Sequence, residues 1–196
     1  MRKSISRVPV FLVASICTAV FMYASLYGTN YAIIESGGIY QAAVSQGQYY
    51  RLLTAMFLHF DFKHILMNMV ALVSLGIALA DEFSGRRFLK IYFISGIVSS
   101  LGVYLLAGPN TLTAGASGAI YGIQGYIIRS VLLGKSYRIG YINKDNVTKL
   151  LILAVAWNFM PGISVIGHLS GMVAGSLLAG LDGLIDSTNT NRKVGR

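Results

Sequence analysis

The sequence predicts an all-α, polytopic membrane protein with six transmembrane helices, and three observations carry this prediction. Of the 196 residues, 55% are hydrophobic and only 12% are charged, about half the charged fraction usual in soluble domains. The apolar residues gather in runs of about 20, the length that crosses a bilayer core as a helix. The basic residues behind the net charge of +9 lie at the ends of these runs. This placement indicates a membrane protein and does not favour nucleic-acid binding.

We expect the six spans near residues 8–27, 62–80, 88–107, 116–134, 148–160 and 164–182. The fifth is short, and Pro161 and Gly162 turn the chain sharply into the sixth. The first run exceeds the apolar length of a cleaved signal peptide, so we interpret it as a span. Cys17, the single cysteine, excludes a disulfide framework. The length suits one domain over residues 1–196.

The placement of lysine and arginine predicts the orientation of the helices. With a cytoplasmic N-terminus, all 16 basic residues except Arg51 and Lys63 fall inside or at inner helix ends. Six spans also return the C-terminus to this basic side. We therefore expect a cell-membrane protein with short cytoplasmic tails at residues 1–7 and 187–196. The tyrosine-rich outer segment 28–61 suits a position partly in the membrane interface.

Polar side chains inside the spans form three groups. His64 and Asn68 lie four residues apart, hence on one face of the second helix. Ser117 and Tyr121 have the same spacing on the fourth helix, and His168 lies at the start of the sixth. Polar groups within a membrane are costly, so they usually face the bundle or have a function. Helices two, four and six run in one direction, which places all three groups at similar depth below the outer surface.

Small residues predict which of these helices approach one another. The sixth helix carries a stripe of small residues at four-residue spacing, formed by Gly167, Gly171, Gly175 and Ala179. The fourth helix carries a shorter stripe, formed by Gly118 and Gly122. Such stripes let helix backbones come close together in membranes. Packing the two stripes against each other brings Ser117 near His168.

A serine beside a histidine suits nucleophilic catalysis. A hydroxyl is a poor nucleophile until a base takes its proton, and an imidazole serves as that base near neutral pH. Attack on a peptide carbonyl then produces an oxyanion, for which His64, Asn68 and the backbone amide of Ser117 are candidate donors. Asp182 lies about 21 Å along the helix from His168. These residues therefore predict a dyad, with Tyr121 stacking on the histidine in place of an orienting acid.

Each residue also has a plainer interpretation. An intramembrane serine usually bonds a backbone carbonyl, a histidine can join helices or relay protons, and GxxxG patterns usually mean packing. A small transporter or channel using His64, Asn68 and His168 as a relay is one alternative, and a structural assembly protein is another. We find no inverted repeat of the transporter kind, and the shared depth of the polar groups favours catalysis.

Four stretches resemble motifs of the rhomboid intramembrane serine proteases. "GASG" is similar to the family's GxSG element, "HILMN" to its HxxxN element, "GHLSGMVAG" to its HxxGxxxG element, and "LHFDFKH" to the stretch before the second-helix histidine. The resemblance implies Ser117 as nucleophile, His168 as general base, and His64 and Asn68 as oxyanion stabilisers. It further implies supporting roles for Tyr121, Gly115, Gly118 and the hydrogen-bonding His59.

The resemblance also implies an activity and partners. The family hydrolyses peptide bonds within or near transmembrane segments of other membrane proteins, so the implied partners are the lipid bilayer and helix-weakened substrates. It implies no metal or organic cofactor, and it leaves homo-oligomers open. The alternative is a proteolytically inactive relative that binds membrane clients, although such relatives normally lack a dyad or oxyanion residue, and all four are present.

A serine below the membrane surface needs water, so we expect the site to open to the outside through a polar cavity. We expect the loop at residues 108–116 to lie inside the bundle, placed there by Gly108 and Pro109 and by Gly115 and Gly118, since irregular backbone at depth is tolerated beside such a cavity. The short fifth helix is the expected mobile wall through which substrates arrive from the lipid.

Overall fold

The structure is a computed structural model that describes residues 2–82, 84–133, 149 and 163–194. Its long helices are α1 (Arg2–Leu26), α5 (Phe62–Glu82), α6 (Gly85–Leu106), α7 (Ser117–Leu132) and α9 (Val165–Val194). Shorter elements lie between α1 and α5, namely α2 (Asn30–Gly37), β1 (Ile39–Tyr40), α3 (Gln41–Ser45), α4 (Arg51–Thr54) and the 3-10 helix η1 (Ala55–Phe57). Strand β2 (Leu112–Thr113) precedes α7 and pairs antiparallel with β1.

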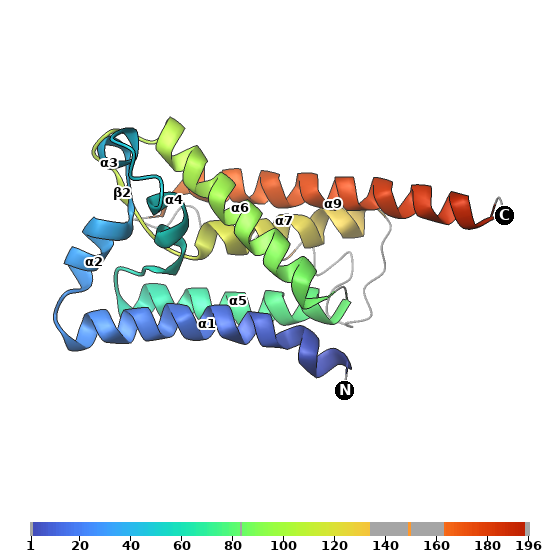
Figure 1. The fold of residues 1–196 in the computed structure, drawn as a ribbon, viewed down its shortest axis with the longest axis horizontal. Helices are drawn as coiled ribbons and strands as arrows, with labels where there is room; N and C mark the ends of the chain where they lie inside the picture. The colour runs from blue at the N-terminus through green and yellow to red at the C-terminus, as the bar shows by residue number, and fades with distance from the viewer. Residues whose placement is uncertain (1, 83, 134–148, 150–162, 195–196) are drawn as a thin grey trace.

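Three of the described helices are long and apolar enough to cross a membrane, over Arg7–Leu26, Gly85–Leu106 and Val165–Leu184. They match the expected first, third and sixth spans. A fourth span is present if Arg51–Phe57 and Phe62–Ile77 count as one segment, which bends by 92° at its break. The expected fifth span, 148–160, lies outside the described residues. The sixth helix is longer than expected, since α9 continues through most of the predicted tail and projects beyond the other helices (Figure 1).

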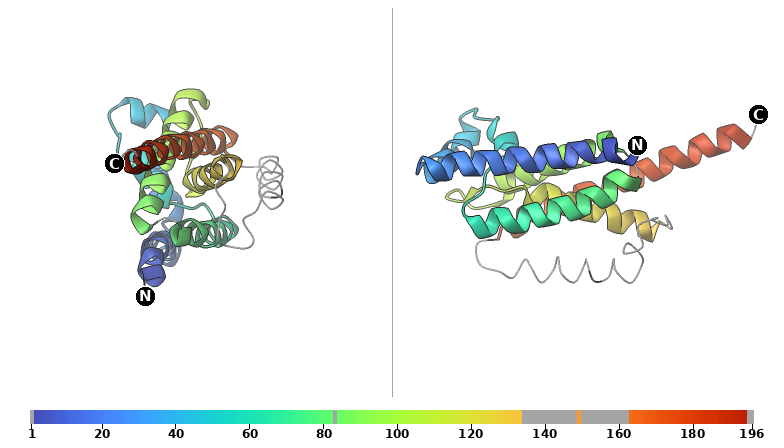
Figure 2. Two further views of the ribbon diagram at one scale, coloured as in Figure 1. Left: turned by 90° about the vertical axis from the view of Figure 1, so that its right-hand side faces the viewer. Right: turned by 90° about the horizontal axis from the view of Figure 1, so that it is seen from below.

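Helix α7 is the centre of the bundle. Thirteen of its 16 residues are buried, and it packs most extensively on α9, then on α6 and α5. The view along the bundle in Figure 2 shows α7 between α9 and α5. Its apolar side chains form one core with α1, α5 and α6 that includes Ile123, Ile127, Leu72 and Phe88. At 16 residues, α7 is about 24 Å long, and its neighbours are protein on almost every side.

The short elements gather at one end of the bundle, opposite the end at which both termini lie (Figure 1). Arg51 organises this end: it is only 6% exposed, and its guanidinium donates to the carbonyls of Glu35 and Gly38 at 2.7 and 2.8 Å and to the Gln48 side chain at 2.8 Å. Thr54 adds a hydrogen bond of 2.7 Å to the carbonyl of Gly37. These bonds hold α4 and η1 against the β1 segment.

The loop before α7 corrects one prediction. Residues 114–116 lie in the bundle, with Ala114 and Ala116 buried, but residues 108–111 are exposed. The expectation was wrong for Gly108 and Pro109 because β2 pairs with β1 and holds the first half of the loop at the surface. Only the last turn of the loop reaches the interior.

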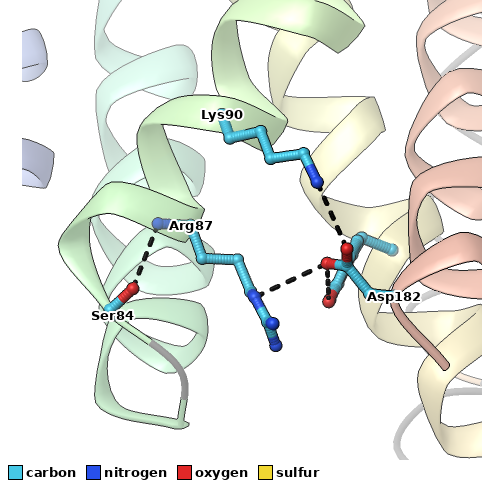
Figure 3. Close-up of polar contacts among 5 residues, drawn as sticks. Ser84, Arg87, Lys90 and Asp182 are labelled. Carbon is cyan, nitrogen blue, oxygen red and sulfur yellow. Dashed lines mark hydrogen bonds and ion pairs between the residues drawn. The ribbon is translucent and has the colours of Figure 1, made fainter. Parts of the chain in front are cut away.

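An ion cluster around one buried carboxylate ties three helices together at the other end (Figure 3). Asp182 of α9 is 5% exposed. Its carboxylate pairs with Lys90 of α6 at 3.2 Å and with Arg87 of α6 at 3.5 Å, and it accepts a hydrogen bond from the Tyr126 hydroxyl of α7 at 2.9 Å. Ser84 caps the start of α6 by accepting from the amide of Arg87. The cluster fixes the spacing of α6, α7 and α9 far from Ser117.

Candidate active site

Ser117 is the first residue of α7 and is partly buried. The two residues before it are held by hydrogen bonds to the η1 region. The amide of Gly115 donates to the carbonyl of Ala55 at 2.9 Å, and the amide of Ala116 donates to His59 Nε2 at 3.5 Å. His59 is 1% exposed, so it is a buried acceptor, as expected of a structural hydrogen bonder. The start of α7 is therefore anchored to the segment that Arg51 organises.

Gly115 brings the α7 start close to His64. Its φ of +139° lies in a region that residues with a side chain rarely adopt, and a Cβ atom there would lie 2.9 Å from both Cε1 and Nε2 of the His64 ring and 3.6 Å from Ser117 Oγ. The His64 ring and the Ser117 hydroxyl thus flank one bare backbone position. Glycine is required here for its backbone conformation and for the space that the imidazole occupies.

The partners of His64 fix its tautomer. Nδ1 accepts from the amide of Phe60 at 3.4 Å, which assigns the ring proton to Nε2 when the imidazole is neutral. The ring also stacks on Phe60, with 6.0 Å between centroids, and meets His59 edge-on at 5.1 Å. Asp61 caps α5 by accepting from the His64 amide at 2.7 Å. The Nε2 side of the ring, which faces Gly115, is therefore a hydrogen-bond donor.

Asn68 lies one turn after His64 and is 7% exposed. Its Nδ2 donates to the His64 carbonyl at 2.8 Å, which leaves the second amide hydrogen available. Its Oδ1 is buried and has no hydrogen-bond partner among the described residues. A buried amide oxygen without a partner is unusual in a folded protein. The Asn68 side chain thus makes one hydrogen bond within α5 and retains further hydrogen-bonding capacity.

His168 stacks on Tyr121. The ring centroids are 3.9 Å apart and the planes differ by 14°, and His168 is 2% exposed. The predicted stacking is confirmed. Tyr121 is four residues after Ser117, hence on the same face of α7, so the contact places the imidazole beside the face that carries the hydroxyl.

The glycine stripes make this approach of α7 and α9 feasible. A Cβ atom on Gly171 would collide with the carbonyl oxygen of Gly118, and one on Gly175 would collide with that of Gly122. The two backbones are therefore in direct contact along the stripes, as the four-residue spacing predicted. Gly118, next to Ser117, lies at the first of these contacts.

Sequence reasoning missed the contribution of α6. Ser99 packs its hydroxyl where a Gly118 side chain would lie and close to Gly167, and Ser95 does the same at Gly122. The signal was available, since these serines repeat the four-residue spacing of the glycines that they contact. Among the described residues, no group of three His, Cys, Asp or Glu side chains could hold a metal ion.

The predicted second helix thus contributes His64 and Asn68 to this region of the bundle, the fourth contributes Ser117 and Tyr121, and the sixth contributes His168. His59 adjoins this region through its ring contact with His64. A polytopic helical membrane protein with a polar site enclosed by its own helices is the class that these features define. The chain belongs to the rhomboid family: the rhomboid domain model matches residues 46–184.

Relatives with curated names agree with this assignment. YdcA of Bacillus subtilis is 34% identical over 141 residues, which cover 71% of this chain and 70% of that protein. The rhomboid protease GluP of the same organism is 30% identical over 153 residues, covering 78% of this chain and 30% of GluP. RHOMBOID-like protein 5 of Arabidopsis thaliana is 31% identical over 147 residues, covering 72% of this chain and 47% of the relative. The chain spans less than half the length of the last two relatives.

Proposed function

We propose that this chain is an intramembrane serine endopeptidase that hydrolyses peptide bonds within or near the transmembrane segments of other membrane proteins. The observation that supports the proposal is that two imidazoles lie close to the first two turns of α7, the helix that begins at Ser117. His64 lies across Gly115 from the hydroxyl, and His168 stacks on Tyr121 one turn along the same helix. The names of the curated relatives, which include a rhomboid protease, support the same activity.

The proposed reaction gives each side chain one step. His168 takes the proton of the Ser117 hydroxyl while Oγ bonds to the scissile carbonyl carbon. The oxygen of that carbonyl becomes an oxyanion, which the His64 Nε2–H, the free Asn68 amide hydrogen and the first amides of α7 stabilise. The C–N bond then breaks, and the leaving amine takes the proton from His168. Water, deprotonated by His168, hydrolyses the acyl-enzyme and restores Ser117.

The proposal includes the topology expected from the sequence. Six spans, cytoplasmic termini and a site open to the outside would form one membrane-embedded domain in the cell membrane. The start of α1 and the end of α9 lie at the end of the bundle opposite the short elements (Figure 1), and the residues just before α7 are anchored to the η1 region, which supports this arrangement. The expected gate at residues 148–160 falls outside the described residues and stays a prediction.

The test compares cleavage of a labelled single-span substrate in liposomes by the unaltered chain, Ser117→Ala, His168→Ala and the matched control Ser130→Ala. Ser130 lies on the same helix, and its buried hydroxyl has no hydrogen-bond partner in the part of the chain that the structure describes, so loss of this hydroxyl should cost little stability. We expect Ser117→Ala and His168→Ala to abolish cleavage, with thermal unfolding unchanged. A fluorophosphonate should label the unaltered chain at Ser117, and this labelling should be absent in Ser117→Ala and strongly reduced in His168→Ala.

One outcome would replace this function by the client-binding alternative. If the unaltered chain neither cleaves helix-weakened substrates nor reacts with the fluorophosphonate, yet retains a transmembrane protein during purification, Ser117 is a packing residue. Cleavage that survives Ser117→Ala would equally overturn the dyad.

A further inference from the structure

A groove lies between exposed side chains of α7 and α9, away from the candidate active site. Its volume is about 430 Å³, and it is lined by Arg129, Ser176, Leu177, Gly180, Leu181 and Leu184. Arg129 is in the last turn of α7, about 18 Å from Ser117 at 1.5 Å per residue. The groove is therefore near the end of the bundle that carries both termini.

The groove arises from one missing side chain. Helices α7 and α9 run in parallel, and Ser176 bonds its hydroxyl to the carbonyl of Gly125 at 3.2 Å. Four residues further along both helices, Arg129 and Gly180 face the same space. A Cβ atom on Gly180 would meet nothing within 4 Å. Gly180 does not serve helix packing, unlike the glycines at the other end of α9.

The walls of the groove are apolar and face outward. Leu177, Leu181 and Leu184 are 64%, 56% and 67% exposed. In a membrane-spanning helix, side chains so exposed contact acyl chains. A groove bounded by three such leucines with a glycine at its floor holds an acyl chain more closely than a smooth helix surface does.

Arg129 supplies the polar end of the groove. Its side chain is exposed and makes no hydrogen bond or ion pair with any residue in the described part of the chain. The buried carboxylate at this end, Asp182, is already paired with Arg87 and Lys90. An arginine at the border of the apolar region extends its guanidinium toward the headgroup level and binds phosphate oxygens in a bidentate manner.

We propose that this groove binds one anionic phospholipid, with an acyl chain along Leu177 and Leu181 and the headgroup phosphate on Arg129. The lipid belongs to the leaflet at the C-terminal ends of α7 and α9. The site does not depend on the proposed protease activity, and it adds a lipid preference to a region remote from Ser117.

The test titrates the purified protein in detergent with phosphatidylglycerol and, separately, phosphatidylcholine, and counts bound lipids by native mass spectrometry. We expect one preferred phosphatidylglycerol. Arg129→Gln should weaken it about fivefold, because one basic residue contributes about that much to anionic-lipid binding. The control Arg86→Gln removes an exposed cation at the same end of the bundle and should leave this lipid bound.

A second variant tests the groove without changing charge. Gly180→Leu fills open space, so the protein should unfold at an unchanged or higher temperature while the preferred lipid is lost. Equal binding of the two lipids, or loss of phosphatidylglycerol in Arg86→Gln as large as in Arg129→Gln, would overturn the site. A change in oligomeric state in Gly180→Leu without loss of lipid would show that a second copy of the chain occupies the groove.

Discussion

The contact between Gly171 and Gly118 gives the sharpest prediction, because a single methyl group should disable the site without removing any polar side chain. In Gly171→Ala, the new Cβ would lie 2.9 Å from the carbonyl carbon of Gly118 and 3.3 Å from its Cα, and closer still to its carbonyl oxygen. These are backbone atoms, so no side-chain rotation relieves the collision.

The size of the expected effect of Gly171→Ala follows from these distances. Non-bonded carbon atoms rest about 3.5–4.0 Å apart, so α7 and α9 must separate by roughly 1 Å at this point. Overpacking of this kind costs about 1–3 kcal/mol of stability. The larger effect falls on the distance between Ser117 and His168, since a displacement of about 1 Å in a catalytic geometry lowers the rate about 100-fold.

The assay measures kcat/KM for a labelled single-span substrate in liposomes, together with thermal unfolding in detergent. The matched control is Gly183→Ala on the same helix, where the new Cβ meets only Leu133 Cδ1 at an ordinary 3.7 Å. Both variants gain the same helix propensity, so their difference isolates the close contact. Activity of Gly171→Ala within about threefold of the control would refute the claim that this contact sets the catalytic geometry.

Three further experiments test other parts of the bundle. Gly115→Ala should remove cleavage. Its control is Gly47→Ala, at a glycine with a φ of +92° and nothing within 4 Å of an added Cβ, which should cost only backbone strain of about 1–3 kcal/mol. Equal activities of the two variants would contradict the role of the close imidazole contact. Tyr121→Phe keeps the stacked ring and should stay active, whereas Tyr121→Ala should lower kcat about 10- to 100-fold; indistinguishable kcat values would mean that stacking does not orient His168. Asp182→Asn should destabilise the protein in thermal unfolding by about 1–3 kcal/mol, since its partners are partly exposed, and a melting temperature equal to that of the unaltered chain would show that the ion cluster contributes nothing.

The close approach of α7 and α9 was predictable from the sequence because a glycine removes the only atoms that keep two helix backbones apart. The spacing of Gly118 and Gly122, and of Gly171 and Gly175, therefore encodes both the partner helix and its register. The stacking of Tyr121 on His168 follows from that register. Residue spacing alone likewise assigns each polar side chain to one face of its helix.

Other features depend on contacts between residues that are distant in sequence, and no local pattern encodes them. Sequence spacing shows only that Asp182 is too far from His168 for a triad, whereas its actual partners, Lys90 and Tyr126, are 92 and 56 residues away. Gly108 and Pro109 predicted a turn, but the pairing of β2 with β1 decides where that turn lies. The length of α9 was also missed, because the polar residues after Leu184 are weak helix formers and the helix continues regardless.

The enclosed position of α7 has a consequence for how the chain enters the bilayer. A segment of 16 residues that includes Gln124, Arg129 and Ser130 is too short and too polar to partition stably into lipid alone. In the folded protein α7 is surrounded by other helices, so its insertion into the bilayer must be coupled to its packing against α6 and α9. The element that carries Ser117 therefore completes its protein surroundings only when α9, the later helix, packs against it. Under the proposed function, the dyad would form only after α9 has been inserted, so a nascent chain that lacks α9 would be inactive.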